Sequence, residues 1–231
     1  MTDWSVVHDH GTVGALHRRS SERLAGLGPD DGRRLVVVHH PVGPALVLGS
    51  TQAEALVDAD ACRRQGVEVA RRRSGGGAVL VDPGDMSWVD VLLPAGDVLW
   101  SADVGRAAWW LGEAWAGALG ALGGPAPEAA VWRGPLLHRP WSALVCFAGL
   151  GPGEVTIDGA KVVGISQRRA RWGALFQSAA LVRWRPQATV GLLALSDAER
   201  ARATQELVGV ATGAGRGGAD ALAGALLAGL P

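Results

Sequence analysis

Apolar residues recur along the chain at two spacings, one typical of helices and one typical of short strands. The spacing of three to four residues is clearest over 103–122, where tryptophans fall on or near the apolar stripe. Ser196 and Glu199 form a capping-box pair, as do Thr51 and Glu54, and each pair predicts the start of a helix. The predicted helices cover residues 12–25, 51–65, 103–122, 196–211 and 218–229, and a loop is expected over 123–127.

Between the helices, short runs rich in β-branched residues are separated by glycine, proline and aspartate turns. The turn at 41–44 predicts a hairpin of the strands before and after it, and Asp158-Gly159 predicts another. Strands in consecutive hairpins, with helices between groups, favour an α+β fold with a mixed, mainly antiparallel sheet flanked by helices. The predicted strands cover residues 34–39, 45–48, 67–72, 78–81, 87–93, 142–148, 153–158, 161–167 and 173–183.

The length of 231 residues suits one large domain with a small appendage. We expect a main domain over 1–185 and a helical extension over 186–231 packed on it. With 22 basic and 22 acidic residues the charge is balanced, which predicts no nucleic-acid partner and no membrane-surface partner. No signal peptide or membrane span is evident, and two cysteines make no disulfide framework, so a cytoplasmic location is expected. No cysteine and histidine cluster has zinc spacing, so no intrinsic metal is expected.

Nearly all basic residues of the chain are arginines. Lys161 is the single lysine among 22 basic residues, and the sequence contains no tyrosine and no asparagine. Such depletion is typical of a genome biased toward GC-rich codons, and the few surviving phenylalanine, isoleucine and lysine residues all lie between 147 and 176. Arginine cannot replace lysine where a compact ammonium group is needed. Lys161 is therefore a candidate functional residue.

The first candidate segment is Arg71-Arg72-Arg73-Ser74-Gly75-Gly76-Gly77. Three glycines allow the backbone to approach a ligand closely and to turn its N–H groups toward an anion. The neighbouring guanidinium groups add forked donors for a phosphate or a carboxylate. The spacing is neither a P-loop nor a dinucleotide fingerprint, and a flexible hairpin loop with surface arginines is the alternative interpretation.

The second candidate segment runs from Glu154 to Arg169. The Asp158-Gly159 turn is expected to place Lys161 at the start of a strand, beside Glu154. A lysine there can stabilise a developing phosphate charge, and the carboxylate can hold Mg²⁺ or orient an incoming amine. An exposed hairpin with a solvated lysine is the alternative.

These segments resemble the lipoate–protein ligase A family. Residues 71–79 resemble its RRxSGGGxV signature, residues 158–169 resemble its second signature (G-x-K-x-x-G-[ST]-[AS]-x-R), and Leu48-Gly-Ser-Thr-Gln52 resembles its G-x-x-Q segment. All three occur in the family's order, and the resemblance covers roughly residues 35–185. It implies the catalytic fold shared by biotin ligases and class II aminoacyl-tRNA synthetases.

The resemblance also implies an activity. Family ligases activate lipoate with ATP and Mg²⁺ to lipoyl-adenylate and pass the acyl group to a lysine of a lipoyl carrier domain. By position, Lys161 would be catalytic, contacting the substrate carboxylate and the α-phosphate, and Glu154 would lie near the adenylate. The substrate-binding residues implied are Gln52, Arg72, Ser74, Gly75, Gly76, Gly77, Ala78, Gly164 and Ser166. The glycine bend and Lys161 are expected to face each other across one acyl-phosphate cavity.

The chain departs from the family pattern in three places. Phe176-Gln177-Ser178-Ala179 stands where many relatives carry His-Gly, and residues 81–85 replace a His-Asp or Asn-rich stretch. The full C-terminal accessory domain of larger ligases is not expected here, and a separate accessory subunit is an alternative source of it.

Two other functions stay open. Val145-Cys146-Phe147 resembles the Cys-Phe segment of octanoyltransferases in the same superfamily, in which the cysteine holds a thioester, so Cys146 is a possible nucleophile. Cysteine is equally often buried as a small apolar residue. A non-catalytic member that only binds a lipoyl or acyl ligand is the third alternative, and lipoate and octanoate remain equivalent candidates for the ligand.

Overall fold

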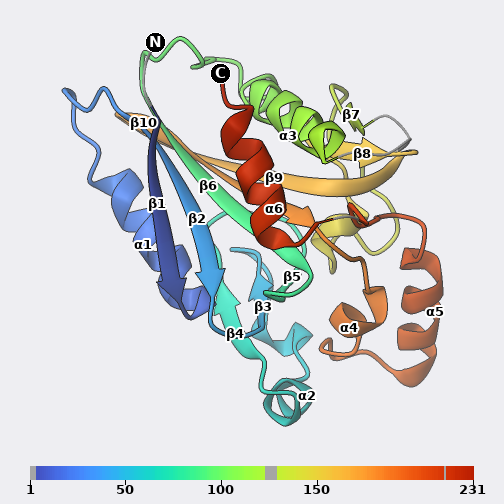
Figure 1. Cartoon of the computed structure of the whole chain (residues 1–231). Helices are drawn as coiled ribbons and strands as arrows, with labels where there is room; N and C mark the ends of the chain where they lie inside the picture. Colours follow the sequence, from blue (N-terminus) through green and yellow to red (C-terminus); the bar gives the residue numbers. More distant parts are fainter. Residues whose placement is uncertain (1–3, 123–128, 216) are drawn as a thin grey trace.

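The computed structural model describes residues 4–122, 129–215 and 217–231. Their strands form two sheets, and the face of the larger sheet opposite the smaller one is covered by two helices (Figure 1). The mixed, mainly antiparallel α+β fold is confirmed, because only the pairs β1–β2 and β3–β4 are parallel among the named strands.

The larger sheet is built around a strand that is buried along its whole length. This strand, β6, has the sequence MSWVDVLLP, and all nine of its residues are buried. It lies between β2 and β10, with antiparallel pairing to both. In sheet order the strands are β1 (Trp4–Gly11), β2 (Arg34–Pro41), β6 (Met86–Pro94), β10 (Gly173–Leu181), β9 (Ala160–Ala170), β8 (Val155–Ile157) and β7 (Ala129–Val131).

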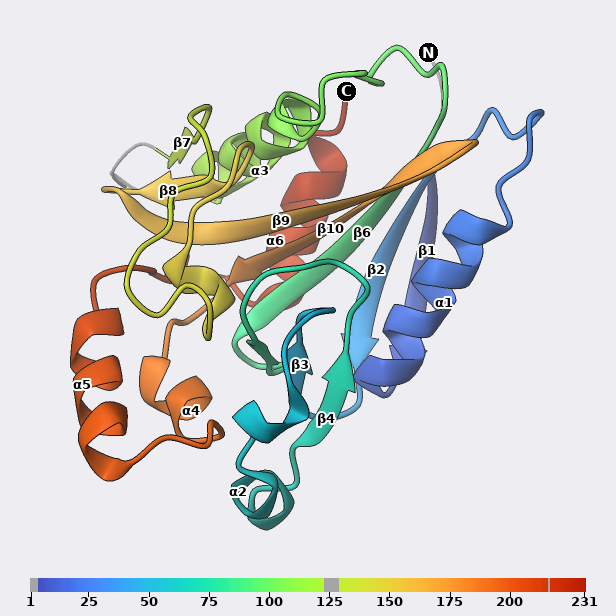
Figure 2. The ribbon, with the colours of Figure 1, turned by 180° about the vertical axis from the view of Figure 1, so that it is seen from behind.

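The smaller sheet packs against one face of the larger sheet (Figure 2). Its order is β4 (Glu68–Arg71), β3 (Ala45–Leu48) and β5 (Val79–Val81). Val47 of β3 and Val81 of β5 share an apolar cluster with Met86 and Trp88 of β6, and helix α1 (Val13–Ala25) contributes Leu16 to it.

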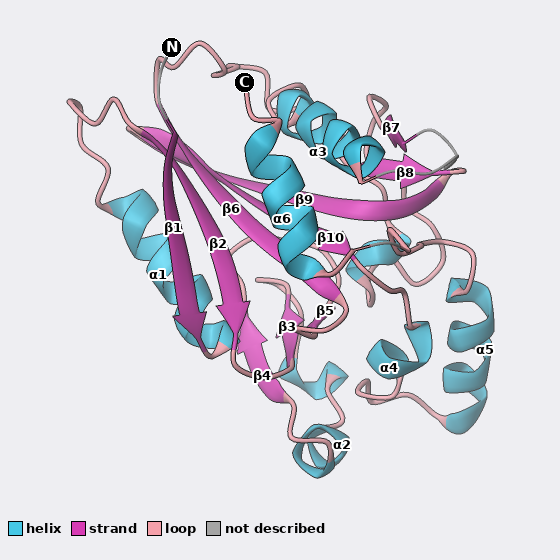
Figure 3. Ribbon diagram, viewed as in Figure 1, coloured by secondary structure: helices cyan, strands magenta, loops and turns pink. Residues whose placement is uncertain are grey.

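The remaining helices cover the outside of this arrangement (Figure 3). Helices α3 (Trp109–Ala121) and α6 (Ala219–Ala228) pack against each other and bury Trp115 and Leu226 on the far face of the larger sheet. Helices α2 (Ala59–Arg64), α4 (Pro186–Val190) and α5 (Asp197–Leu207) surround the smaller sheet in a separate apolar cluster, and two 3₁₀ turns are η1 (Glu54–Leu56) and η2 (Cys146–Ala148).

Several local predictions were wrong. The hairpin predicted across 41–44 does not form, because β2 pairs with β1 and β6 while β3 enters the other sheet. The helix predicted over 51–65 is broken, because Val57 is extended and bridges Leu193, and α2 begins after Asp58, whose side chain accepts from the Ala61 N–H.

Other differences concern the ends and the types of elements. The strand predicted over 142–148 is a turn followed by η2, and residues 103–108 are turns and bends instead of the first part of α3. Strands β1 and β7 were not predicted. The loop expected over 123–127 lies outside the described residues. No helix among the described residues is long and apolar enough to cross a membrane.

Candidate active site

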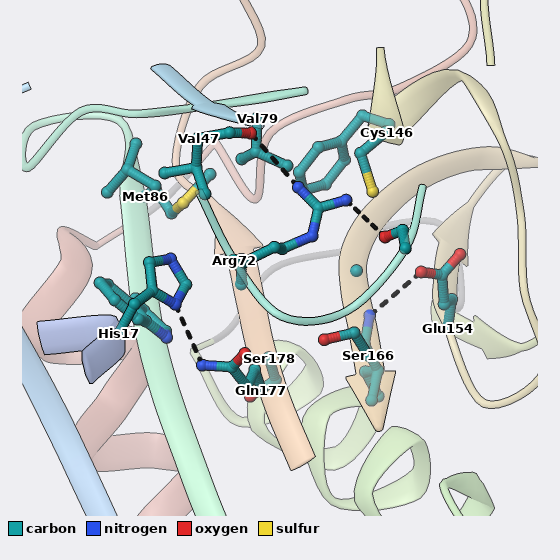
Figure 4. A pocket seen from close by; sticks show the side chains of 17 residues that line it. His17, Val47, Arg72, Val79, Met86, Cys146, Glu154, Ser166, Gln177 and Ser178 are labelled. Atoms are coloured by element: carbon teal, nitrogen blue, oxygen red, sulfur yellow. Dashed lines mark hydrogen bonds between the residues drawn. The ribbon is translucent and has the colours of Figure 1, made fainter. Parts of the chain in front are cut away.

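A pocket lies between the two sheets, and we call it the central pocket (Figure 4). Its cavity volume is about 90 Å³. Most of its wall is apolar, which suits a ligand with a hydrocarbon portion. The apolar wall comes from both sheets and from η2, and includes Val47, Val79, Val81, Met86, Trp88, Phe147, Ile165 and Ala179; the polar or small lining residues are His17, Arg72, Gly75, Cys146, Glu154, Gly164, Ser166, Gln177 and Ser178.

Arg72 braces the glycine loop from inside. Its Nη2 donates to the carbonyls of Gly75 (2.6 Å) and Gly77 (2.8 Å), and its Nη1 donates to Val47 O (3.3 Å). Burial lowers the pKa of this guanidinium below its ordinary value, but arginine remains charged in proteins. Arg72 therefore lines the pocket as predicted while its donors hold the bend in place.

The bend is packed so closely that only glycine fits at some of its positions. A Cβ at Gly77 would lie 2.7 Å from the backbone nitrogen of Cys146, and a Cβ at Gly49 would overlap the carbonyl oxygen of Gly76. Cys146 N donates to Ala78 O at 2.9 Å, which ties the cysteine to the glycine loop. Gln52 stabilises the segment that packs on this bend, because its Oε1 accepts from Gly49 N at 3.0 Å. Gln52 itself does not line the pocket.

Lys161 lies behind the wall of the central pocket. It is 1% exposed, and its Nζ is 2.8 Å from Glu154 Oε2. The same ammonium donates to the carbonyls of Gly149 (3.1 Å) and Cys146 (3.3 Å). Gly164 separates it from the cavity, since a Cβ there would lie 3.3 Å from Lys161 Cε. The glycine bend and Lys161 are thus neighbours of one pocket, but the lysine does not face the bend across open space.

Glu154 lines the pocket and contacts several groups around it. Besides Lys161, it accepts from the backbone nitrogens of Gly151 (2.6 Å to Oε2) and Ile165 (3.1 Å to Oε1). Oε2 contacts both Lys161 and Gly151, whereas Oε1 has the single backbone partner Ile165, so Oε1 keeps a lone pair that can accept from or coordinate a further group. Among the described residues, no group of three or more histidine, cysteine or acidic side chains is placed to hold a metal ion.

Cys146, Gly164 and Ser166 line the pocket near Glu154, as Figure 4 shows for the labelled side chains. The Cys146 Sγ lies 3.8 Å from where a Cβ of Gly76 would be. Ser74 Oγ is buried and has no hydrogen-bond partner in the described part of the chain. The thiol is therefore available to a ligand that enters beside the glycine loop, whereas the Ser74 hydroxyl lies beneath that loop and does not line the pocket.

A polar network at the other side of the pocket was not predicted. Gln177 Nε2 donates to Asp90 Oδ2 (3.0 Å) and lies 3.4 Å from His17 Nδ1. Asp90 also accepts from Trp88 Nε1 (2.7 Å) and pairs with His39. Burial would raise the pKa of Asp90, but His39 outweighs it and holds that pKa below its ordinary value. The sequence signal was the acidic residue inside the apolar strand 87–93, where an unpaired charge would be costly.

Burial lowers the pKa of His17 to about 4, with Asp90 opposing the shift. A histidine in the unfolded chain binds a proton near pH 6.5, so between pH about 6.5 and about 4 the unfolded state binds more protons. We therefore expect the free energy of unfolding to decrease by up to about 3 kcal/mol, from His17 alone, as the pH is lowered from about 6.5 to about 4. Urea denaturation across the window checks this, and His17→Gln should remove that part of the slope; an unchanged slope would contradict it.

Outside the pocket, arginines from three segments line an open surface depression, which we call the basic depression. It is formed by Arg18, Arg71, Arg73 and Arg168, and it shares His17 with the central pocket. A second part of it includes Arg72, which also lines the pocket. Arg73 and Arg168 have no acidic partner within 4.0 Å among the described residues. An anionic group beside the pocket mouth would meet this positive charge.

The fold has clear counterparts among solved structures. A bipartite lipoate protein ligase from Thermoplasma acidophilum, described with its E2 lipoyl domain, matches with a TM-score of 0.75 and 18% identity over 99% of this chain and 82% of that chain. A candidate lipoate protein ligase from T. acidophilum with bound lipoic acid matches with a TM-score of 0.71 and 19% identity, covering 96% and 80%. A lipoate-protein ligase A bound with ATP matches with a TM-score of 0.68 and 20% identity over 98% of this chain and 82% of that chain. No curated protein matches the chain by sequence.

The chain therefore has the fold of the catalytic domains of lipoate ligases. The model of the lipoyl protein ligase A/B catalytic domain matches residues 21–212. The chain belongs to this family.

Proposed function

We propose that the protein activates lipoate or octanoate with ATP and transfers the acyl group to a lysine of a lipoyl carrier domain. One observation carries the proposal: the apolar central pocket lies beside the glycine loop and shares His17 and Arg72 with the basic depression. The hydrocarbon tail would lie in the pocket, and the phosphates would lie toward Arg71, Arg73 and Arg168. The solved ligases with bound lipoic acid and with ATP are consistent with this.

The chemistry needs no covalent bond to the protein. A carboxylate oxygen of the acid attacks the α-phosphate of ATP and pyrophosphate leaves; the carrier lysine amine then attacks the acyl carbonyl, and AMP leaves as the amine loses its proton. Arginine forks and loop N–H groups would stabilise the charge on the phosphate. Mg²⁺ would neutralise phosphate charge while held mainly by the phosphates and water, and Glu154 would contact it through Oε1 or orient the incoming amine. Lys161 would position Glu154 and the Cys146 carbonyl, or turn toward the substrate.

A second function is favoured by the place of Cys146. Its thiol lines the central pocket while the Lys161 ammonium lies behind the wall. Octanoyl transfer would begin with attack of the thiolate on an acyl-carrier thioester, which releases the carrier thiol, and would end with attack of the acceptor lysine amine on the Cys146 thioester. A non-catalytic acyl-binding protein is the remaining alternative.

Mass spectrometry of the carrier and of Cys146, together with a pyrophosphate-exchange assay, separates the three functions. We expect lipoate with ATP and a lipoyl carrier domain to give a lipoylated carrier, with lipoate-dependent exchange of pyrophosphate into ATP. An octanoyl adduct on Cys146 formed from octanoyl carrier without ATP, and absent from Cys146→Ser, would instead establish the transferase. If the protein binds the acid and catalyses neither reaction, its function is that of the non-catalytic acyl-binding protein.

The protein partners, the division into domains and the cellular location are also proposals. We propose a lipoyl carrier domain as the protein partner, in line with the T. acidophilum ligase described with its E2 lipoyl domain, and a separate accessory subunit as a possible second partner. We retain residues 1–185 as the catalytic domain and 186–231 as an extension packed on it, since Lys161 N donates to Val210 O at 3.0 Å. A cytoplasmic location is proposed because Cys62 and Cys146 are both free.

A further inference from the structure

A second cavity lies beside the central pocket, and three side chains belong to the walls of both. They are Val79, Met86 and Phe147. The cavity volume of the second cavity is about 20 Å³, and its other lining residues include Leu181 and Trp184. A single layer of side chains therefore separates an apolar pocket from a smaller space that is apolar on the side of Leu181 and Trp184 and charged on the side of Asp85 and Arg183.

Of the three shared side chains, Met86 is the one that can move. Val79 is β-branched on β5, so its χ1 is restricted. Phe147 is held between the ammonium of Lys161, 5.0 Å from its ring centroid, and the ring of Trp184 at 5.9 Å. Met86 is unbranched and has three rotatable bonds, which lets it adapt to irregular space without moving the backbone.

Met86 lies at the side of the central pocket away from the reactive groups. In Figure 4, Met86 and His17 lie on one side, and Cys146, Glu154 and Ser166 lie on the other. An acyl group with its carbonyl carbon beside Cys146 and the glycine loop therefore directs its tail toward Met86. The side chain of Met86 is buried, so the tail would meet it as a wall.

We propose that Met86 sets the length of the acyl chain that the central pocket accepts, and that the second cavity is an extension of the pocket behind this side chain. This inference rests on the proposed function, because it requires an acyl ligand whose carbonyl end lies at the glycine loop, where Gly76 is close to both Arg72 and Cys146. The extension ends at a polar wall, where Asp85 Oδ1 accepts from Arg183 Nε at 2.6 Å and Asp85 Oδ2 accepts from Arg185 Nε at 2.5 Å. A methyl terminus cannot replace these ion pairs, so the wall limits the longest chain.

The test is the chain-length profile of binding, measured by calorimetry with hexanoate, octanoate, decanoate and dodecanoate. Met86→Ala is expected to shift the preference toward the longer acids, with a rise of about tenfold or more in the affinity for dodecanoate relative to octanoate. Met86→Leu, which keeps the volume, should retain the original order. Met86→Phe should shift the preference toward hexanoate.

A second variant tests the cavity itself. Ala188 lines the second cavity and does not line the central pocket. Ala188→Leu in the Met86→Ala background should fill the extension and remove the gain for dodecanoate, while octanoate binding stays. An unchanged order of affinities in Met86→Ala and Met86→Phe, with octanoate still bound, would overturn this inference alone. Failure of the unsubstituted protein to bind any of the acids would overturn the proposed function, and this inference with it.

Discussion

Replacing Lys161 by alanine is expected to abolish acyl transfer and to lower the free energy of unfolding by about 3–5 kcal/mol. The ammonium forms a buried ion pair with Glu154 at 2.8 Å and donates to two backbone carbonyls. Removing it leaves a buried carboxylate without its countercharge, and that uncompensated charge is the source of the cost. Urea denaturation gives the stability, and carrier lipoylation gives the activity.

A matched control separates the two effects. Replacing Lys161 by methionine together with Glu154 by leucine removes both charges and keeps most of the volume, so part of the lost stability is expected to return. Recovery is incomplete because the N–H groups of Gly151 and Ile165 lose their acceptor. Activity should remain absent, because the polar arrangement around the Cys146 carbonyl is gone. Turnover at the original rate in Lys161→Ala would refute any catalytic or positioning role for this lysine.

Gly77→Ala is expected to cost about 1–3 kcal/mol of stability and to prevent acyl transfer. A Cβ at this position would lie 2.7 Å from both the backbone nitrogen of Cys146 and the carbonyl carbon of Val145. Backbone atoms cannot move aside as a flexible side chain can, so the glycine loop and η2 must separate. The central pocket is built from both segments and would lose its shape.

Gly75→Ala is the control for this prediction, because a Cβ at Gly75 meets nothing within 4 Å. Its stability is expected to change by less than about 0.5 kcal/mol. The pair is compared by thermal and urea denaturation. Equal stabilities of the two variants would show that the contact between the loop and η2 is not tight, and the account of the bend given above would be wrong.

The class of fold could be predicted from the sequence because it depends on strong local patterns. The 3.6-residue spacing of α1 and α3 and the β-rich runs of β6 and β10 survive in the structure. The pairing of β3 could not be predicted, because a turn such as 41–44 serves equally well for a hairpin and for a crossing between layers. Strand β1 carries exposed valines and histidines, so no buried face marked it.

The candidate site was predicted in part. Arg72, Gly75, Cys146, Glu154, Gly164 and Ser166 line one pocket, as their motifs suggested. The spacing of the motif residues did not predict that Lys161 would lie behind Gly164. The two are three residues apart on one strand, and the burial of a side chain depends on what packs around it. His17 and Met86 belong to no motif, and they reach the pocket only because two sheets are stacked.

The burial of β6 also has a consequence for synthesis. One of its edges pairs with β2, which precedes it, but the other pairs with β10, and 78 residues lie between Pro94 at the end of β6 and Gly173 at the start of β10. At the usual translation speed, this strand waits on the order of 4–16 s after its synthesis for its second neighbour. During that interval the open edge of β6 can pair with other chains. The yield of folded protein should therefore depend more on the supply of chaperones than on the free energy of unfolding of the finished protein.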